Sequence, residues 1–277
     1  MFWLNNNEQT DGLPSNLIKV KPPYRNGVPT EHNHHLKHWW KLQRYCMLIQ
    51  KIFYGLLRMN DFYNENIMVE RNKSPYTAIT GCTFLFYEFQ RILPLLTDAN
   101  SETLLKDEIE NNRVLQVNSI ASRKRFMAEF KRRYAAVPAR FWQTWPNMSE
   151  AGQRAGLFYA ILKTYKLVFD FHFNVTMKKW NSIDHTLLKD DLLMEFNELS
   201  AHDAFVDSWS DMTKHKCCST YLTILRQSGL LDEKTNELTA IKLDASEFAY
   251  YIRSGEEWFM EACLLYPYEI NDIKNQL

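Results

Sequence analysis

The sequence predicts a mainly α-helical protein, and its composition and periodicity support that prediction. Only 8 glycines and 9 prolines occur among 277 residues, which disfavours turn-rich all-β folds. Apolar residues form 45% of the chain and the formal net charge is zero, so the chain is not globally disordered and can bury a large core. From residue 76 onward, the apolar positions recur mainly at helical spacing.

Three parts are expected along the chain. Residues 1–75 form an N-terminal extension, which we expect to be partly disordered because prolines and polar residues interrupt its first half. One aromatic, basic amphipathic helix is predicted within it, over 36–59. Met68 is a second candidate start, and the intact mass of the native protein would distinguish the two starts. The rest of the chain is expected to form an N-terminal and a C-terminal helical domain, over residues 76–148 and 149–277.

The N-terminal domain is predicted to contain three helices. An apolar run over residues 79–96 predicts a helix that ends near Pro94. A second helix covers 102–112, and its polar side includes Glu108. A third helix covers 119–137. Its apolar stripe consists of Ile120, Met127, Phe130, Tyr134 and Val137.

The C-terminal domain begins with a long predicted helix. Ser149 is a suitable N-cap for a helical stretch that runs to about Trp180. Leucines and a phenylalanine at helical spacing predict the next helix over 187–199. A short helix over 201–209 follows, and a turn separates it from the next helix.

The last third of the chain has the order of a winged helix-turn-helix. A helix over 214–228 ends at Gly229, which suits the left-handed residue after a helix. Residues 230–243 are predicted to form a small β-hairpin. Asp244 and Glu247 have the spacing of a capping box, which would begin the final helices. The succession of helix, turn, helix and hairpin therefore predicts a winged unit.

A basic segment makes the first candidate site. Seven basic residues and one acid, Glu129, fall within 118–140, whereas residues 149–277 carry a formal charge of −7. The helix over 102–112, a link and the helix over 119–137 resemble a helix-turn-helix, whose second helix would offer backbone N–H groups, hydroxyls and guanidinium groups to DNA phosphates. The predicted contacts are Ser119, Ser122, Arg123, Lys124 and Arg125, with added charge from Lys131, Arg132 and Arg133. The alternatives are a solvated basic face and an internal partner for the acidic domain.

A second candidate site lies at the start of the helix over 214–228. Small hydroxyls and lysines in the first turns of a helix suit contact with a DNA groove and with phosphates. The predicted contacts are Thr213, Lys214, Lys216 and Ser219. Three acids, Asp203, Asp207 and Asp211, come just before them. Because winged helices also dock proteins, the two functions are equally supported at this position.

The sequence indicates no catalytic or metal site and no cofactor. The histidines between Glu31 and His38 lie in a proline-flanked polar stretch, which fits a solvated tract better than a metal site. His202 and Asp203 are adjacent but lack companion ligands, and no phosphate-binding glycine loop is present. The five cysteines, at positions 46, 82, 217, 218 and 263, have neither metal nor disulfide spacing. We therefore expect a protein that is not an enzyme.

The same features predict a cytoplasmic protein. No stretch of about 18 apolar residues without charges is available to span a membrane. The N-terminus lacks the basic and apolar regions of a secretory signal. An odd number of cysteines is typical of reduced thiols in the cytoplasm.

Several short motifs resemble the BrxA family of BREX bacteriophage-exclusion systems. The segments Ile109-Glu110-Asn111-Asn112, Leu115-Gln116 and Ser119-Ile120-Ala121-Ser122-Arg123-Lys124-Arg125 are similar to the central signature of that family. Leu162-Lys163-Thr164-Tyr165 with Asp170-Phe171, and Thr213 before Gly229-Leu230-Leu231, follow in the family's order. The similarity covers about Tyr76 to Pro267, and residues 1–67 have no counterpart.

The resemblance implies an all-helical, monomeric protein that binds double-stranded DNA and has no enzymatic activity. It implies two helix-turn-helix units beside a positive surface, with the contacts named above at the matching positions. It also implies action in phage resistance together with a BREX methyltransferase and ATPase. Two alternatives remain open from the residues: a helical scaffold that docks other defence proteins, and a transcriptional regulator.

Overall fold

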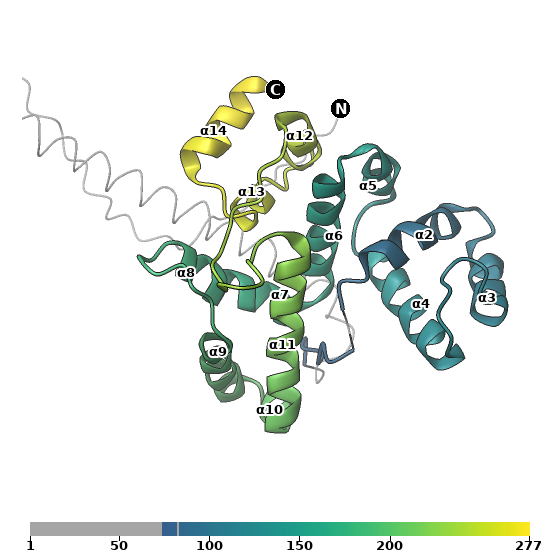
Figure 1. Cartoon of the computed structure of the whole chain (residues 1–277), viewed down its shortest axis with the longest axis horizontal. Coiled ribbons are helices and arrows are strands. Elements are labelled where there is room, and N and C mark those ends of the chain that lie inside the picture. The colour runs from purple at the N-terminus through teal and green to yellow at the C-terminus, as the bar shows by residue number, and fades with distance from the viewer. Residues whose placement is uncertain (1–73, 82) are drawn as a thin grey trace, which may run out of the picture. The chain divides into compact units, whose positions relative to one another are not determined.

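The computed structural model describes residues 74–81 and 83–277, which form helices joined by short links (Figure 1). The prediction of a mainly helical fold is confirmed for this part of the chain. The helix predicted over 36–59 lies outside the described residues, as does the histidine-rich tract. All described residues belong to one compact unit, and the division into 76–148 and 149–277 stays a prediction.

The described chain up to Asn147 contains four α-helices and one 3-10 turn. They are α2 (Phe86–Thr97), α3 (Ser101–Asn111), α4 (Ile120–Ala135), α5 (Ala139–Thr144) and η1 (Trp145–Asn147). α2 continues past Pro94, where the sequence predicted its end. Because Leu93 and Leu96 in the last turns are buried, their burial outweighs the backbone hydrogen bond that proline cannot donate.

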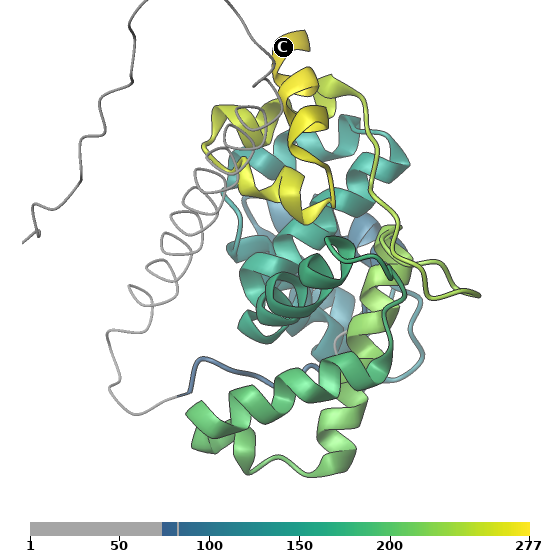
Figure 2. The ribbon, with the colours of Figure 1, turned by 90° about the vertical axis from the view of Figure 1, so that its left-hand side faces the viewer.

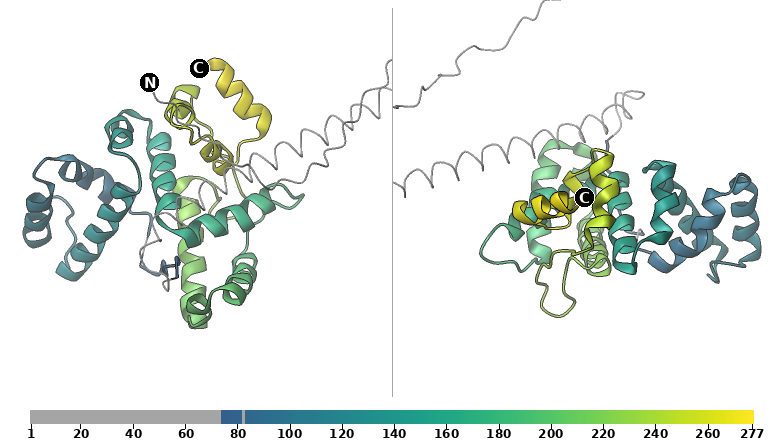
Figure 3. Two further views of the ribbon diagram at one scale, coloured as in Figure 1. Left: turned by 180° about the vertical axis from the view of Figure 1, so that it is seen from behind. Right: turned by 90° about the horizontal axis from the view of Figure 1, so that it is seen from above.

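Helix α6 (Glu150–Thr164) lies between the group α2–α5 on one side and α7 and α11 on the other (Figures 1 and 3). The Ser149 hydroxyl caps it by accepting the Gly152 N–H at 3.0 Å, as the sequence predicted. A Cβ at Gly156 would lie 2.7 Å from Trp145 Cδ1. Glycine therefore permits the close approach of α6 to η1.

The long helix predicted as far as Trp180 is interrupted at Tyr165, which has extended backbone angles. Three short elements follow it: α7 (Lys166–Asp170), the π-helical turn η2 (Phe171–Thr176) and α8 (Met177–Trp180). η2 contains a buried histidine, His172, whose ring nitrogens lie 3.0 Å from the Tyr221 hydroxyl and 2.8 Å from the Ala262 carbonyl. This turn therefore joins α6–α8 to α11 and to the segment near Ala262.

Six further helices complete the described chain. They are α9 (Lys189–His202), α10 (Ala204–Asp207), α11 (Asp211–Ser228), α12 (Ala245–Arg253), α13 (Trp258–Ala262) and α14 (Pro267–Gln276). α11 ends at Gly229, whose φ of 89° is the left-handed conformation that the sequence predicted. Figure 2 shows α9–α11 at its lower edge and α14 at the upper edge, beside the C-terminus.

The predicted β-hairpin over 230–243 is wrong in its extent. Only a short antiparallel pairing forms, in which the Asp232 N–H donates to the Glu237 carbonyl at 2.9 Å and the Thr239 N–H donates to the Leu230 carbonyl at 3.0 Å. Within the described residues, the only pairings are isolated bridges, from Leu231 to Leu238 and from Thr186 to Glu237. The backbone N–H of Leu238 donates to the His185 carbonyl at 3.0 Å, and that of Ile241 donates to the Cys263 carbonyl at 2.9 Å. Because these N–H groups bond to distant segments, the pairing does not extend into a winged hairpin.

The predicted capping box at Asp244 and Glu247 is also wrong. The Asp244 side chain makes no cap hydrogen bond in α12. The Glu247 carboxylate instead accepts hydrogen bonds from the Ser149 backbone N–H at 2.7 Å and from its hydroxyl at 3.1 Å. The N-terminal end of α6 attracts this carboxylate because its N–H groups carry partial positive charge.

Candidate nucleic-acid interface

The α3–α4 pair is joined by a linker that a buried arginine holds. Arg123, in the first turn of α4, is only 5% exposed. Its guanidinium donates to the carbonyls of Ile109 at 2.7 Å, Val117 at 2.6 Å and Asn118 at 3.1 Å. These carbonyls belong to the end of α3 and to the linker, so Arg123 fixes the angle at which the two helices meet.

A buried acid in α3, Glu108, accepts hydrogen bonds from the backbone of the linker. The sequence placed Glu108 on the polar side of its helix, but the side chain is 2% exposed. Its carboxylate accepts N–H groups from Arg113 at 3.1 Å, Val114 at 3.0 Å and Leu115 at 2.8 Å. Asn112 has a φ of 51°, which turns the linker back over the end of α3. The linker therefore has an ordered path, as a helix-turn-helix requires.

A second arginine of the basic segment is also internal. Arg133 is 0% exposed. It donates to the carbonyls of Phe84 at 2.7 Å and Thr83 at 2.6 Å, which precede α2. Arg123 and Arg133 therefore stabilise the fold, and a DNA phosphate cannot reach either side chain without local unfolding.

Two other cations of the segment form ion pairs but stay open to solvent. Lys131 pairs with Glu102 at 2.9 Å, and its side chain is 40% exposed. Arg132 pairs with Glu129 at 3.1 Å and is 49% exposed. Ion pairs at a surface contribute about 0–1 kcal/mol. A phosphate can therefore replace Glu102 as the partner of Lys131 at a small cost in free energy. Glu129 is only 12% exposed and also accepts a hydrogen bond from Tyr165, so Arg132 would keep this partner while its exposed side meets a phosphate.

The remaining cations near the start of α4 are exposed. Lys124 and Arg125 form no ion pair and no hydrogen bond with any described residue. Ser119 caps α4 by accepting the Ser122 N–H at 3.4 Å. Lys124, Arg125 and the two hydroxyls occupy the end of α4 where the helix dipole favours an anion.

A non-helical segment, residues 74–81, connects this end of α4 with the second candidate site. The Ser74 hydroxyl donates to Asp203 at 2.8 Å, beside α10. The Tyr76 hydroxyl donates to Asp170 in α7 at 2.7 Å. A Cβ at Gly81 would lie 3.5 Å from the Arg125 guanidinium. Sequence reasoning missed this connection, because it depends on contacts between residues that are 94 and 129 positions apart.

The second set of predicted contacts lies on the first turns of α11, and most of them have internal partners. Lys214 donates to the Ser200 hydroxyl at 2.9 Å, and the Ser219 hydroxyl donates to the His215 carbonyl at 3.0 Å. The Thr213 hydroxyl lies 3.0 Å from that of Ser210. Lys216 is exposed and forms no ion pair with the described residues. The structure therefore offers one exposed cation here, near the acids that precede α11.

Other kinds of site have little support in the described residues. No group of three or more His, Cys, Asp or Glu side chains could hold a metal ion there. Burial raises the pKa of Cys217 to about 11 and that of Cys218 to about 12, so both thiols stay protonated near neutral pH. Within the described part of the chain, the helices are too short or too polar to cross a membrane.

Comparisons with known proteins give a family model, a curated relative and a solved structure that match the chain. The family model described as BrxA matches residues 75–255. A curated relative, the BREX protein BrxA from Bacillus cereus (strain H3081.97), is 24% identical over 183 residues, which cover 65% of this chain and 92% of that protein. The crystal structure of an uncharacterized protein from Magnetospirillum magneticum has a TM-score of 0.58 at 23% identity, and the match covers 68% of this chain and 97% of that one. The structural match supports the fold alone.

Proposed function

Because the chain belongs to the BrxA family of BREX phage-defence systems, we propose that it is an accessory protein that binds double-stranded DNA. In this proposal it acts in the cytoplasm as a monomer, alongside BREX components such as the methyltransferase and the ATPase. It has no enzymatic activity of its own. The observation that carries the proposal is the pair of exposed cations, Lys124 and Arg125, at the N-terminal end of α4.

The proposed contact surface is smaller than the one predicted from the sequence. It retains five solvent-accessible cations together with nearby hydroxyls, and it leaves out the buried Arg123 and Arg133. The cations are Lys124, Arg125, Lys131, Arg132 and Lys216. The hydroxyls are Ser119, Ser122, Thr213 and Ser219, with Lys214 beside them. In this proposal the α3–α4 pair is the first helix-turn-helix, and α10–α11 forms the second without a wing.

The dependence of DNA affinity on salt tests this proposal. If five cations each neutralise a phosphate, log K falls with log salt at a slope of about −4.5. The double variant Lys124→Gln/Arg125→Gln is expected to bind a random-sequence duplex roughly tenfold more weakly and to reduce the steepness of the slope by about 2. Fluorescence anisotropy at several salt concentrations measures both quantities.

The matched control removes two exposed cations elsewhere, Arg91→Gln/Lys178→Gln, and should leave affinity and slope close to those of the wild type. Circular dichroism should show that both double variants are folded, because the four side chains are exposed. Equal binding by the wild type and the Lys124/Arg125 variant would remove α4 from the DNA surface.

A second candidate function, protein docking, is favoured by the end of the molecule that α9–α11 form. Three large apolar side chains are exposed there: Met194 at 63%, Phe205 at 52% and Met212 at 82%. They lie close in sequence to Asp203, Asp207 and Asp211. Exposed apolar groups beside charged ones are typical of protein interfaces.

The variant Phe205→Ser/Met212→Ser distinguishes docking from DNA binding. If this surface docks a defence component, the variant should lose co-elution with the co-expressed BREX ATPase or methyltransferase in size-exclusion chromatography. Its DNA affinity should be unchanged, since neither residue is a cation. Ile183→Ser, which changes another exposed apolar residue, is the control. Co-elution that survives the double substitution would exclude this surface as the docking site.

A further inference from the structure

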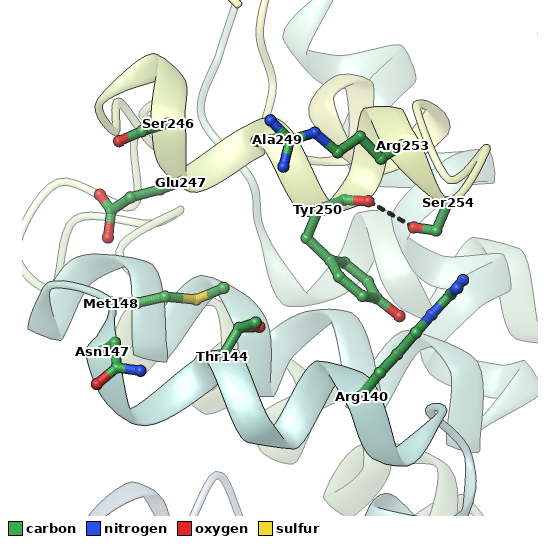
Figure 4. A pocket seen from close by; sticks show the side chains of 10 residues that line it. All are labelled: Arg140, Thr144, Asn147, Met148, Ser246, Glu247, Ala249, Tyr250, Arg253 and Ser254. Atoms are coloured by element: carbon green, nitrogen blue, oxygen red, sulfur yellow. Dashed lines mark hydrogen bonds between the residues drawn. The ribbon is translucent and has the colours of Figure 1, made fainter.

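An open pocket of about 450 Å³ lies between the corner formed by α5 and η1 and the face of α12 (Figure 4). Its volume falls within the range of about 300–1,000 Å³ that is usual for small-molecule sites. Two arginines, Arg140 from α5 and Arg253 from α12, and the ring of Tyr250 line it. The pocket shares no residue with the proposed DNA surface on α4 and α11.

The two arginines give the pocket its positive character. Both are exposed, and neither forms an ion pair or a side-chain hydrogen bond with any described residue. The guanidinium carbon of Arg140 lies 5.9 Å from the centroid of the Tyr250 ring. In Figure 4 the two guanidinium groups lie on either side of that ring. Each therefore has its donors available for an anion that enters the pocket.

One acid, Glu247, is present among the described residues that line the pocket. Both of its carboxylate oxygens accept hydrogen bonds from Ser149 at the start of α6. The partial positive charge of that helix end offsets much of the carboxylate charge. Because the charge of Glu247 is largely offset, the two arginines give the pocket a net positive charge.

The ring of Tyr250 is held in place from within the fold. It packs against Phe141, with 4.9 Å between the ring centroids, and against Tyr251 at 5.6 Å. The side chain is half-buried, and the ring borders the pocket. A fixed aromatic ring between two cations provides a surface on which a planar base can stack.

We propose that this pocket binds a nucleotide, with its base against the Tyr250 ring and its phosphate on the guanidinium of Arg253 or Arg140. A guanidinium group matches the geometry of phosphate oxygens and pairs with two of them at once. The hydroxyl of Ser246, which also lines the pocket, supplies a further donor. The nucleotide has two sources with the same chemistry: a free mononucleotide, or the 5′-phosphorylated end of a DNA strand.

Isothermal titration calorimetry of the full chain tests the proposal with AMP, inorganic phosphate and adenosine. AMP should bind most tightly, phosphate more weakly, and adenosine should give no measurable heat. Arg140→Gln/Arg253→Gln should weaken AMP binding at least about tenfold, because two charge-assisted contacts are lost. Arg91→Gln, which changes an exposed arginine outside the pocket, should bind AMP as the wild type does.

Absence of AMP binding to the wild type, or equal binding by the double arginine variant, would overturn the proposal. Competition for bound AMP by short duplexes with and without a 5′-phosphate separates the two sources. Competition only by the phosphorylated duplex assigns the pocket to DNA ends, and competition by neither duplex assigns it to free nucleotides. Equal competition by both duplexes would contradict a site for a terminal phosphate. The Lys124→Gln/Arg125→Gln variant should bind AMP normally, so failure of the DNA proposal would leave this one standing.

Discussion

Arg133→Ala is expected to lower the free energy of unfolding by about 3 kcal/mol, because it strips two carbonyls of a charged donor inside the fold. Arg133 is fully buried and donates to Thr83 and Phe84. Without the guanidinium, the buried Phe84 carbonyl has lost its donor and the start of α2 has lost its anchor on α4. Urea denaturation followed by circular dichroism measures the change.

Lys124→Ala is the matched control for this prediction. It lies on the same helix and removes the same charge, but its side chain is exposed, so the free energy of unfolding should change by less than about 0.5 kcal/mol. For DNA affinity the order of the two effects should be reversed. At a temperature where both are folded, Lys124→Ala should weaken binding and Arg133→Ala should not. Equal stability of the two variants would show that Arg133 is not the internal cation described above.

Acidification from pH 7 to pH 5 is expected to remove about 2 kcal/mol of stability through His172 alone. Complete burial lowers the pKa of His172 to about 4, against about 6.5 in an unfolded chain. Below pH 6.5 the unfolded chain therefore binds a proton that the folded protein does not. Unfolding is favoured as the pH falls towards 4, and stability returns as the pH rises above 6.5.

Burial keeps the His172 ring neutral, and its hydrogen bonds decide which ring nitrogen carries the proton. Its Nε2 faces the Ala262 carbonyl, which only accepts, so Nε2 carries the proton. Nδ1 then accepts from the Tyr221 hydroxyl, and that hydroxyl accepts from Thr176 at 2.7 Å. A second proton, on Nδ1, would break the hydrogen bond from Tyr221 and place a positive charge in the core.

His172→Gln should be less stable at pH 7 and should lose most of the decline in stability between pH 7 and 5. His202→Gln changes an exposed histidine on α9 and should keep that decline. Chemical denaturation at intervals of half a pH unit measures both. Retention of the full decline in His172→Gln would assign the acid sensitivity to other groups.

Two helices carry charged residues at the spacing of their apolar stripes, and this spacing indicates that the charges are buried. Arg123 lies four residues before the buried Met127, and Arg133 lies three residues after the buried Phe130. In a helix these spacings place residues on one face, so both arginines share the apolar stripe of α4. Glu108 likewise follows the buried Leu105 by three residues. A charged residue on an apolar stripe indicates a buried partner for backbone groups.

Local sequence alone determined the helical class, most helix positions and several helix ends, because these depend on side chains within a few residues. Ser149 and Gly229 occupy the caps that the sequence predicted. The family match also follows from sequence. Only the tertiary structure decided which cations are exposed, since the carbonyls that Arg133 meets come from Thr83 and Phe84, about fifty positions away. It also decided that the pairing within residues 230–243 stays short, because the N–H groups of Leu238 and Ile241 bond to His185 and Cys263, which only folding brings near.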